Sequence, residues 1–326
     1  MGRPIILVIK EIYYPILAAV GIPANLVTIV ILSRGHCGLS KCISVYMVAM
    51  AAADLLVMII NVLLYRIFSY RFPFSFLSHT PMCRLITYMS TVTFDLSVWF
   101  TVSFTFDRFV ALCYQKFKTR HWTVRSAAAV LTTFSILSCF KNIPFLFAYK
   151  SQQIINMVQW GCQSSAAFFQ SPLGVAYVWF HSACVVWLPF TLIVLFNSFT
   201  VRRILVANRA RRALRSQRSE NHSETELDNR RKSIILLFTI SGTFILLWLT
   251  AAMSFVTTRL TNTNYYRGGR TSPGYIAMET GALLKFLSSI QNPCIYAATQ
   301  KKFRADLKNV VKSPWTLILR LVRKYR

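Results

Sequence analysis

Several ionisable residues lie inside stretches of the sequence that are otherwise apolar, and four of them are considered first. Asp54 is near the middle of one stretch, the neighbours Asp107 and Arg108 are near the end of another, and Lys285 is in the last one. An ionised side chain at membrane depth is costly unless it is paired or hydrated, so each is a candidate for binding an ion, a ligand or a protein. Arginine stays charged and presents several donors. Asp107 can therefore neutralise Arg108.

These residues are carried by seven long apolar runs. Each run is long enough to cross the roughly 30 Å hydrocarbon core of a bilayer as a helix, and unbroken runs of this length exclude a β-barrel. The chain is 55% hydrophobic and only 14% charged. We therefore predict an all-α membrane protein, a seven-transmembrane helix bundle. The runs are 12–33, 43–65, 85–112, 126–148, 174–200, 233–257 and 274–297.

The net charge of +27 would fit a nucleic-acid-binding protein, but its distribution argues against one. Of the 37 lysines and arginines, 25 lie in the loops after spans 1, 3 and 5 and in the C-terminal tail. The positive-inside rule makes that side cytoplasmic. We expect residues 1–11 to be an extracellular N-terminus, 12–297 the seven-span domain, and 298–326 cytoplasmic. A basic tail in that place is expected to meet anionic inner-leaflet lipid rather than nucleic acid.

The beginning of this tail has an amphipathic pattern. Phe303, Leu307 and Val311 follow one another at four-residue spacing, so they share one face of a helix over Thr299–Val311. Such a helix lies on the membrane surface with its lysines outward. The prediction is thus a bundle of seven spans followed by a short amphipathic eighth helix.

Two motifs stand at the ends of spans on the predicted cytoplasmic side. Asp107-Arg108-Phe109 closes span 3, and Asn292-Pro293-Cys294-Ile295-Tyr296 closes span 7. With seven spans, this arrangement resembles the rhodopsin-like (class A) G-protein-coupled receptors over about residues 12–311. The resemblance implies a plasma-membrane receptor, not an enzyme, that binds a small extracellular ligand and activates a heterotrimeric G protein.

Parts of spans 1, 2 and 5 also resemble a small orphan-like subgroup reported to sense aromatic amino acids and short peptides. These parts include GIPANLVTIVILS, AAADLLV and VWFHSACVVWLP. This second resemblance only orders the ligand candidates, which are an amino acid, a short peptide or another small polar or aromatic molecule.

The family resemblance assigns a switch between ligand and G protein to nine residues. Activation is expected to swing span 6 outward and to free the span 3 arginine for a G-protein helix, while the span 7 tyrosine moves toward that arginine. The alternatives are a helix-end ion pair and a passive proline kink. The residues are Asp107, Arg108, Phe109, Asn292, Pro293, Tyr296, Phe244, Trp248 and Pro189.

The resemblance also outlines a ligand pocket, formed by Ser90, Thr91, Phe94, His181, Trp248, Lys285 and Arg66. Ser90 stands where aminergic relatives carry the acid that binds the ligand amine, so an amine receptor is disfavoured. Lys285, with Arg66, is expected to receive a ligand carboxylate or another acceptor. The alternatives are an internally paired or snorkelling Lys285 and a His181 that only forms pocket wall. The position of the opsin lysine is Phe286 here, so an opsin is disfavoured.

An ion site and a disulfide complete the expectations. Asp54, Ser97, Asn25 and Asn292 would form the family's Na⁺ site, the alternative being a water-filled polar network; no other cofactor is expected. Cys83 and Cys162 both fall on the oxidising side and, by the resemblance, would form a disulfide between the outer loop and span 3, where the alternative is two free thiols.

Four positions depart from the family pattern. Thr250 replaces the span 6 proline, Phe134 the span 4 tryptophan, and Asn197 the span 5 tyrosine. Arg230 or a neighbour replaces the acid that often pairs with the span 3 arginine, so we expect appreciable basal signalling.

A channel or transporter is the competing function. Asp54, Asp95 and Lys285 could line a path through the membrane. The sequence has no internal repeat, however, which weakens a transporter built from duplicated halves. The two motifs at the ends of spans 3 and 7 would also have no purpose in such a protein.

Overall fold

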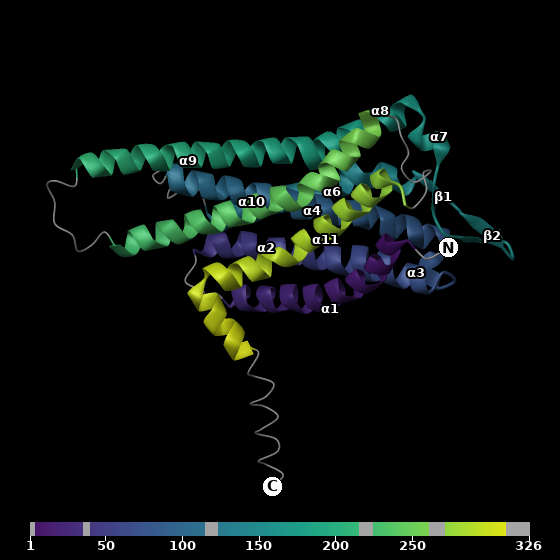
Figure 1. Ribbon diagram of the computed structural model, residues 1–326, viewed down its shortest axis with the longest axis horizontal. Coiled ribbons are helices and arrows are strands. Elements are labelled where there is room, and N and C mark those ends of the chain that lie inside the picture. Colours follow the sequence, from purple (N-terminus) through teal and green to yellow (C-terminus); the bar gives the residue numbers. More distant parts are fainter. Residues whose placement is uncertain (1–3, 35–39, 115–122, 215–223, 261–270, 311–326) are drawn as a thin grey trace, which may run out of the picture.

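Long helices run side by side and form a single bundle in the computed structural model (Figure 1). The structure describes residues 4–34, 40–114, 123–214, 224–260 and 271–310. The seven spans, in chain order, are α1 (Ile5–Ser33); α2 (Lys41–Leu56) with η1 (Val57–Phe68) and α3 (Ser69–Arg71); α4 (Thr80–Cys113); α6 (Val124–Asn142) with η3 (Ile143–Leu146); α8 (Pro172–Ser182) with η4 (Ala183–Trp187) and α9 (Leu188–Leu214); α10 (Glu224–Leu260); and α11 (Pro273–Thr299).

Six of these spans, in the described part of the chain, are long and apolar enough to cross a membrane by length and composition alone. The seventh, α11, has 27 residues, which at 1.5 Å per residue is about 40 Å of helix. It is less apolar because it carries Glu279, Lys285, Gln291 and Asn292. Its length and its place in the bundle make it the seventh span, so the predicted all-α seven-helix bundle is confirmed.

Local sequence explains several helix starts. The side-chain oxygens of Ser40 and Ser272 accept hydrogen bonds from backbone N–H groups at the starts of α2 and α11. Thr123 and Ser126 bond reciprocally at the start of α6. These caps satisfy donors that the first turn of a helix leaves without partners. α1 begins at Ile5, seven residues before the apolar run predicted at 12.

Two spans contain π-helical segments that the apolar pattern does not indicate. η1 forms the second half of span 2, and η4 lies just before Pro189 in span 5. In a π-helix the backbone hydrogen bonds join residues i and i+5, so each turn contains more residues than a turn of an α-helix. Such a segment rotates every side chain that follows, and in span 2 one of these is Arg66.

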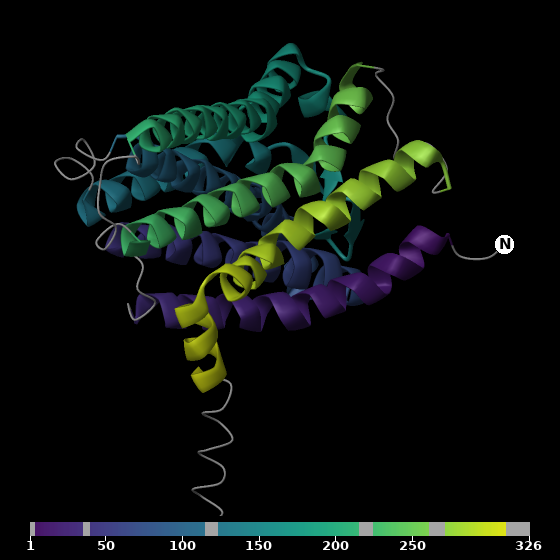
Figure 2. The same ribbon diagram turned by 60° about the vertical axis from the view of Figure 1, so that its left-hand side comes forward.

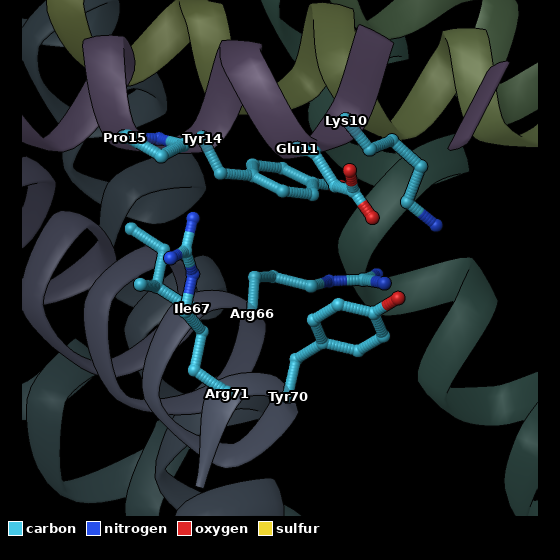
Figure 3. Close-up of a pocket in the computed structure, with 8 residues that line it drawn as sticks. All are labelled: Lys10, Glu11, Tyr14, Pro15, Arg66, Ile67, Tyr70 and Arg71. Atoms are coloured by element: carbon cyan, nitrogen blue, oxygen red, sulfur yellow. The ribbon is translucent and has the colours of Figure 1, made fainter. Parts of the chain in front are cut away.

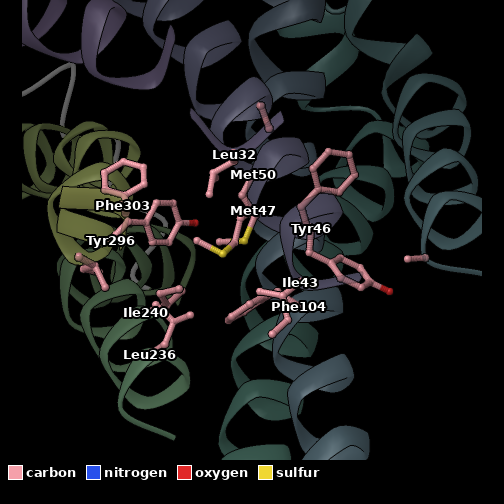
Figure 4. Packing of buried hydrophobic residues seen from close by; sticks show 14 of the residues in the cluster. Leu32, Ile43, Tyr46, Met47, Met50, Phe104, Leu236, Ile240, Tyr296 and Phe303 are labelled. Carbon is pink, nitrogen blue, oxygen red and sulfur yellow. The ribbon is translucent and has the colours of Figure 1, made fainter. Parts of the chain in front are cut away.

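The largest core cluster contains Phe104 and Tyr296 and fills one half of the bundle (Figure 4). Arg108 lies against Phe104, and we name this half the motif end. Tyr46, Met47 and Met50 of α2 pack there with Phe104 of α4 and with α10 and α11. Residues 301–310 form the eighth helix. Its Phe303 is 2% exposed and joins this cluster, while Leu307 packs against it. Val311, the third residue of the predicted stripe, lies outside the described residues.

The opposite end of the bundle, which we name the hairpin end, is covered by β1 (Tyr149–Lys150) paired with β4 (Gln163–Ser164) and β2 (Gln153–Ile155) paired with β3 (Val158–Trp160). Asn156 and Met157 both have positive φ, as the tight turn between β2 and β3 requires. A short helix, α7 (Ala166–Phe169), leads from β4 into span 5.

The hairpin is fastened to the start of span 3. Cys83 and Cys162 form the predicted disulfide. Beside it, the Gly161 N–H donates to the Ser78 carbonyl at 2.7 Å, and the Thr80 hydroxyl donates to the Gly161 carbonyl at 2.9 Å. The loop is therefore held on α4 by the disulfide and one hydrogen bond, and on Ser78, two residues before α4, by the other.

α10 has Thr250 in place of the family's proline and contains no proline in its described part. The helix nevertheless changes direction toward its hairpin end (Figure 2). In that part α10 meets α11 backbone to backbone. A Cβ atom added to Gly281 would lie 2.7 Å from both the Cα and the N of Ala251. Glycine at position 281 thus allows the two helices to approach this closely.

Candidate functional site

A polar cluster lies in the middle of the bundle and includes the residues predicted to bind Na⁺. The Ser97 hydroxyl donates to Asp54 Oδ1 at 2.7 Å, and Asn292 Nδ2 donates to Asp54 Oδ2 at 2.8 Å. Asn25 Nδ2 instead donates to the Ser289 carbonyl at 2.9 Å. Three of the four predicted residues are therefore in direct contact, and the fourth joins them through α11.

The oxygens of this cluster suit a hard cation. Asp54, Ser97, Asn25 and Asn292 are at most 7% exposed. The side-chain carbonyl oxygens of both asparagines are buried without a hydrogen-bond partner among the described residues. Carboxylate, hydroxyl and amide oxygens are the ligands that such ions take. These residues fit the predicted ion.

An aromatic floor supports Lys285 closer to the hairpin end. The Lys285 ammonium lies 3.8 Å from the centroid of the Phe94 ring and 5.7 Å from those of Trp248 and Phe286. Phe94 and Trp248 meet edge to face at 6.0 Å, and the indole N–H of Trp248 donates to Ser288 at 3.0 Å. A cation over ring faces is stabilised by their quadrupoles. Within the described residues Lys285 has no ion-paired carboxylate.

Arg66 shares this aromatic floor from the second span. Its guanidinium lies 5.9 Å from the Phe286 ring centroid, 5.7 Å from that of Tyr14 and 5.5 Å from that of Tyr65. It also lines a cavity of about 370 Å³ between α1 and η1 (Figure 3). The cavity is lined by Lys10, Glu11, Tyr14, Pro15, Arg66, Ile67, Tyr70 and Arg71.

The two small polar residues predicted for the pocket have partners in the protein. The Ser90 hydroxyl donates to the side-chain oxygen Oδ1 of Asn61, and Asn61 Nδ2 donates to the Thr93 hydroxyl at 2.9 Å. The Thr91 hydroxyl donates to the Tyr88 carbonyl at 2.7 Å. Sequence reasoning did not include Asn61. Its polar side chain inside an apolar run was the signal that could have identified it.

His181 lies beside an ion pair that the sequence analysis did not predict. Lys141 Nζ is 2.7 Å from Asp95 Oδ2 and 3.2 Å from His181 Nδ1. The amide of Asn142 also donates to Asp95 Oδ2. Asp95 and Asn142 are fully buried. This network joins α4, α6 and α8 at the level of the aromatic floor, since Asp95 follows Phe94 directly.

The motif end contains the second group of predicted residues. Arg108 Nε donates to Asp107 Oδ2 at 2.9 Å, and the two side chains are 2% and 0% exposed. Phe109 stacks on Phe196 of α9 at 5.6 Å. Tyr296 packs edge to face on Phe303 at 6.0 Å, and its buried hydroxyl has no partner in the described part of the chain. Arg108 is thus neutralised by its neighbour, while Tyr296 lies in the core.

Two of the residues that depart from the family pattern, Phe134 and Asn197, contact neighbouring helices. Phe134 stacks on Trp99 of α4 at 4.7 Å, and Asn197 Nδ2 donates to Ser241 of α10 at 2.8 Å. Phe244 and Trp248 pack at 5.3 Å on one face of α10, as their spacing predicts. The side chain of Arg230 lies outside the described residues.

A comparison with known protein families decides the class of the molecule. The family described as 7 transmembrane receptor (rhodopsin family) matches residues 24–296. The chain belongs to this family. It is a G-protein-coupled receptor and a multi-pass membrane protein, and its family is one of receptors rather than of enzymes. The channel or transporter interpretation has no support from this match.

The receptor therefore combines three polar levels along α4. Ser97 reaches the central polar cluster, Phe94 and Asp95 lie between Lys285 and Lys141, and Arg108 lies at the motif end. Ser97 is eleven residues before Arg108, about three helical turns. One helix thus contributes residues to the central polar cluster, to the aromatic floor and to the motif end.

Proposed function

We propose that this receptor lies in the plasma membrane with its N-terminus and hairpin end outside, binds a small extracellular ligand that carries a carboxylate, and activates a heterotrimeric G protein. One observation carries the ligand proposal. The Lys285 ammonium lies 3.8 Å from the Phe94 ring centroid and has no ion-paired carboxylate among the described residues. Lys285 is half-buried and, among the described residues, its ammonium contacts aromatic rings, so an anionic ligand group would give this charge a partner.

The surrounding residues favour a ligand that is also aromatic. Phe94, Trp248 and Phe286 meet at the ammonium, so a ligand ring could pack on theirs edge to face or offset. Arg66 offers a second cation over Phe286. The proposed ligands are therefore aromatic amino acids, short peptides with a free C-terminus and related carboxylates.

The proposed coupling to a G protein rests on Arg108. A movement of α10 away from α4 would expose this arginine at the motif end, where a G-protein helix could supply acceptors that replace Asp107. We also propose that Na⁺ binds at Asp54. The basic C-terminal segment is proposed to contact anionic lipid of the inner leaflet. The tail beyond residue 310 lies outside the described residues.

The test of the ligand anchor begins with a screen of aromatic amino acids and short peptides, with calcium and cAMP readouts. Lys285→Met is then compared with the wild type, and Lys41→Met, which changes an exposed lysine at the start of α2, is the matched control. A hydrogen bond to a charged group contributes about 1.5–3 kcal/mol, so we expect a potency loss of roughly 10- to 150-fold for carboxylates.

The amide of the same ligand sharpens this test. On the wild type, the amide should be less potent than the carboxylate. The Lys285→Met substitution should reduce the potency of the amide only slightly further, because the amide has no negative charge for Lys285 to bind. Unchanged carboxylate potency on Lys285→Met, at equal surface expression, would remove Lys285 as the anchor.

A further inference from the structure

The ion pair between α4 and α6 constrains the proton on His181. Lys141 Nζ lies 2.7 Å from Asp95 Oδ2, so Lys141 is an ammonium ion with Asp95 as its counter-ion. An ammonium group has three donors and no acceptor. The atom of His181 that faces it at 3.2 Å, Nδ1, must therefore be an acceptor.

An imidazole that accepts at Nδ1 is neutral and carries its proton on Nε2. A charged His181 would place two cations, the imidazolium and the Lys141 ammonium, within hydrogen-bond distance of each other inside the bundle. The nearby carboxylate, Asp95, is already the counter-ion of Lys141. Asp95 is engaged by Lys141 and by Asn142 of α6. The described residues offer no hydrogen-bond partner to His181 Nε2.

The other groups around the ring fit this assignment. Phe145 meets it edge to face at 5.0 Å, and the Tyr177 hydroxyl donates to the Lys141 carbonyl at 2.9 Å instead of to the imidazole. Cys184 lies one turn further along span 5. From α11, the Lys285 ammonium contacts the ring of Phe94, the residue before Asp95, and so adds a second positive charge near this network.

We infer that Asp95 and Lys141 hold His181 as the neutral Nε2–H tautomer, and that this N–H is a second anchor that donates to an acceptor on the ligand, such as an amide carbonyl. The ligand half of this inference rests on the proposed function. Asp95 and Lys141 are positioning residues. With Lys285, the receptor would then offer two donors to a ligand, which favours an acylated amino acid or a dipeptide over a simple amine.

The proton assignment is tested without any ligand. The receptor, labelled with ¹⁵N-histidine and held in nanodiscs, is studied by nitrogen NMR between pH 5 and pH 8, and His181→Gln identifies the His181 signals among those of the five histidines. We expect one protonated and one unprotonated ring nitrogen, with the proton on Nε2, throughout this range. A proton on Nδ1, or a charged ring at pH 7, would overturn the assignment.

The role of the ion pair is tested with two variants. Lys141→Met removes the donor, and His181 should then take up a second proton within the same pH range because Asp95 is left uncompensated. The double variant Asp95→Asn/Lys141→Met removes both charges of the pair, so no uncompensated charge remains that could prevent folding. This variant should give a mixture of tautomers. If Nε2–H remains exclusive in the double variant, the ion pair does not position the proton.

The donor role is tested with N-acetyl-L-phenylalanine, which has a ring, a carboxylate and an amide carbonyl, by saturation-transfer NMR. His181→Gln keeps an N–H near the position of Nε2 and should retain binding, whereas His181→Phe should weaken it by roughly tenfold. Equal affinity for His181→Phe would overturn the donor role. Failure of the Lys285 anchor would appear separately, as an unchanged potency of Lys285→Met.

Discussion

Gly281→Ala gives the sharpest test of the contact between α10 and α11. The added Cβ would lie 2.7 Å from two backbone atoms of Ala251 and 3.1 Å from the carbonyl carbon of Thr250. Backbone atoms cannot rotate away as a side chain can, so the two helices must separate. Overpacking of this kind costs about 1–3 kcal/mol.

A second glycine provides a matched control. Gly242 lies on α10, and a Cβ atom there would meet nothing within 4 Å. Replacing glycine by alanine within a helix gains about 0.8–1.0 kcal/mol at either position. The difference between the two variants therefore isolates the collision at Ala251, and it should be about 1–3 kcal/mol in favour of Gly242→Ala.

Thermal unfolding of the purified receptor measures this difference. Cys42 is buried and forms no disulfide, so its reaction with a thiol-reactive dye, above the signal of the exposed Cys139 and Cys294, reports the opening of the bundle. Gly242→Ala should unfold at or above the wild-type temperature, and Gly281→Ala several degrees below Gly242→Ala. If the two variants unfold at the same temperature, the helices do not touch at Gly281 and the packing of α10 on α11 described above is wrong.

Four further predictions concern other parts of the receptor. Wild-type thermal stability should rise in NaCl relative to choline chloride and that of Asp54→Asn should not; an equal response would exclude Na⁺ at the central cluster. Cys83→Ser opens a link between residues 79 apart and should cost about 4.5 kcal/mol by chain entropy; wild-type stability after reduction would contradict this. Phe303→Ala should cost about 3–5 kcal/mol of packing and speed tryptic cleavage at Lys301, with Lys308→Ala as an exposed control; equal cleavage rates would show that Phe303 does not hold the eighth helix. Cells expressing the receptor should have second-messenger levels different from those of cells without it, and identical levels would refute the predicted basal signalling.

The sequence could predict the features that follow from the length of its apolar runs or from the family resemblance. Seven apolar runs fixed the number of spans, and two cysteines on the oxidising side, placed by the family resemblance, identified the disulfide. The contacts of Asp54 with Ser97 and Asn292 followed from the same resemblance.

The features that could not be predicted depend on the rotation of one helix against another. Lys141 meets Asp95 and His181 only because α4, α6 and α8 turn these faces together. Two opposite charges inside apolar runs were nevertheless a signal, since each requires a partner at membrane depth. The π-helical segments have no comparable signal, because the apolar residues of η1 would fit an α-helix equally well.

The π-helical segment of span 2 has a consequence for how substitutions are compared among relatives. Residues before η1 can be matched to those of another receptor by counting from Asp54, but beyond it the same count points to a different side of the helix. Arg66 lies after most of this segment and faces Tyr14 and Phe286. An alignment without gaps would thus pair Arg66 with a residue that points elsewhere in any receptor whose second span is α-helical throughout. Differences in ligand preference that are traced to such a pairing would be assigned to the wrong side chain, and a one-residue deletion within η1 could change the pocket as much as any substitution in it.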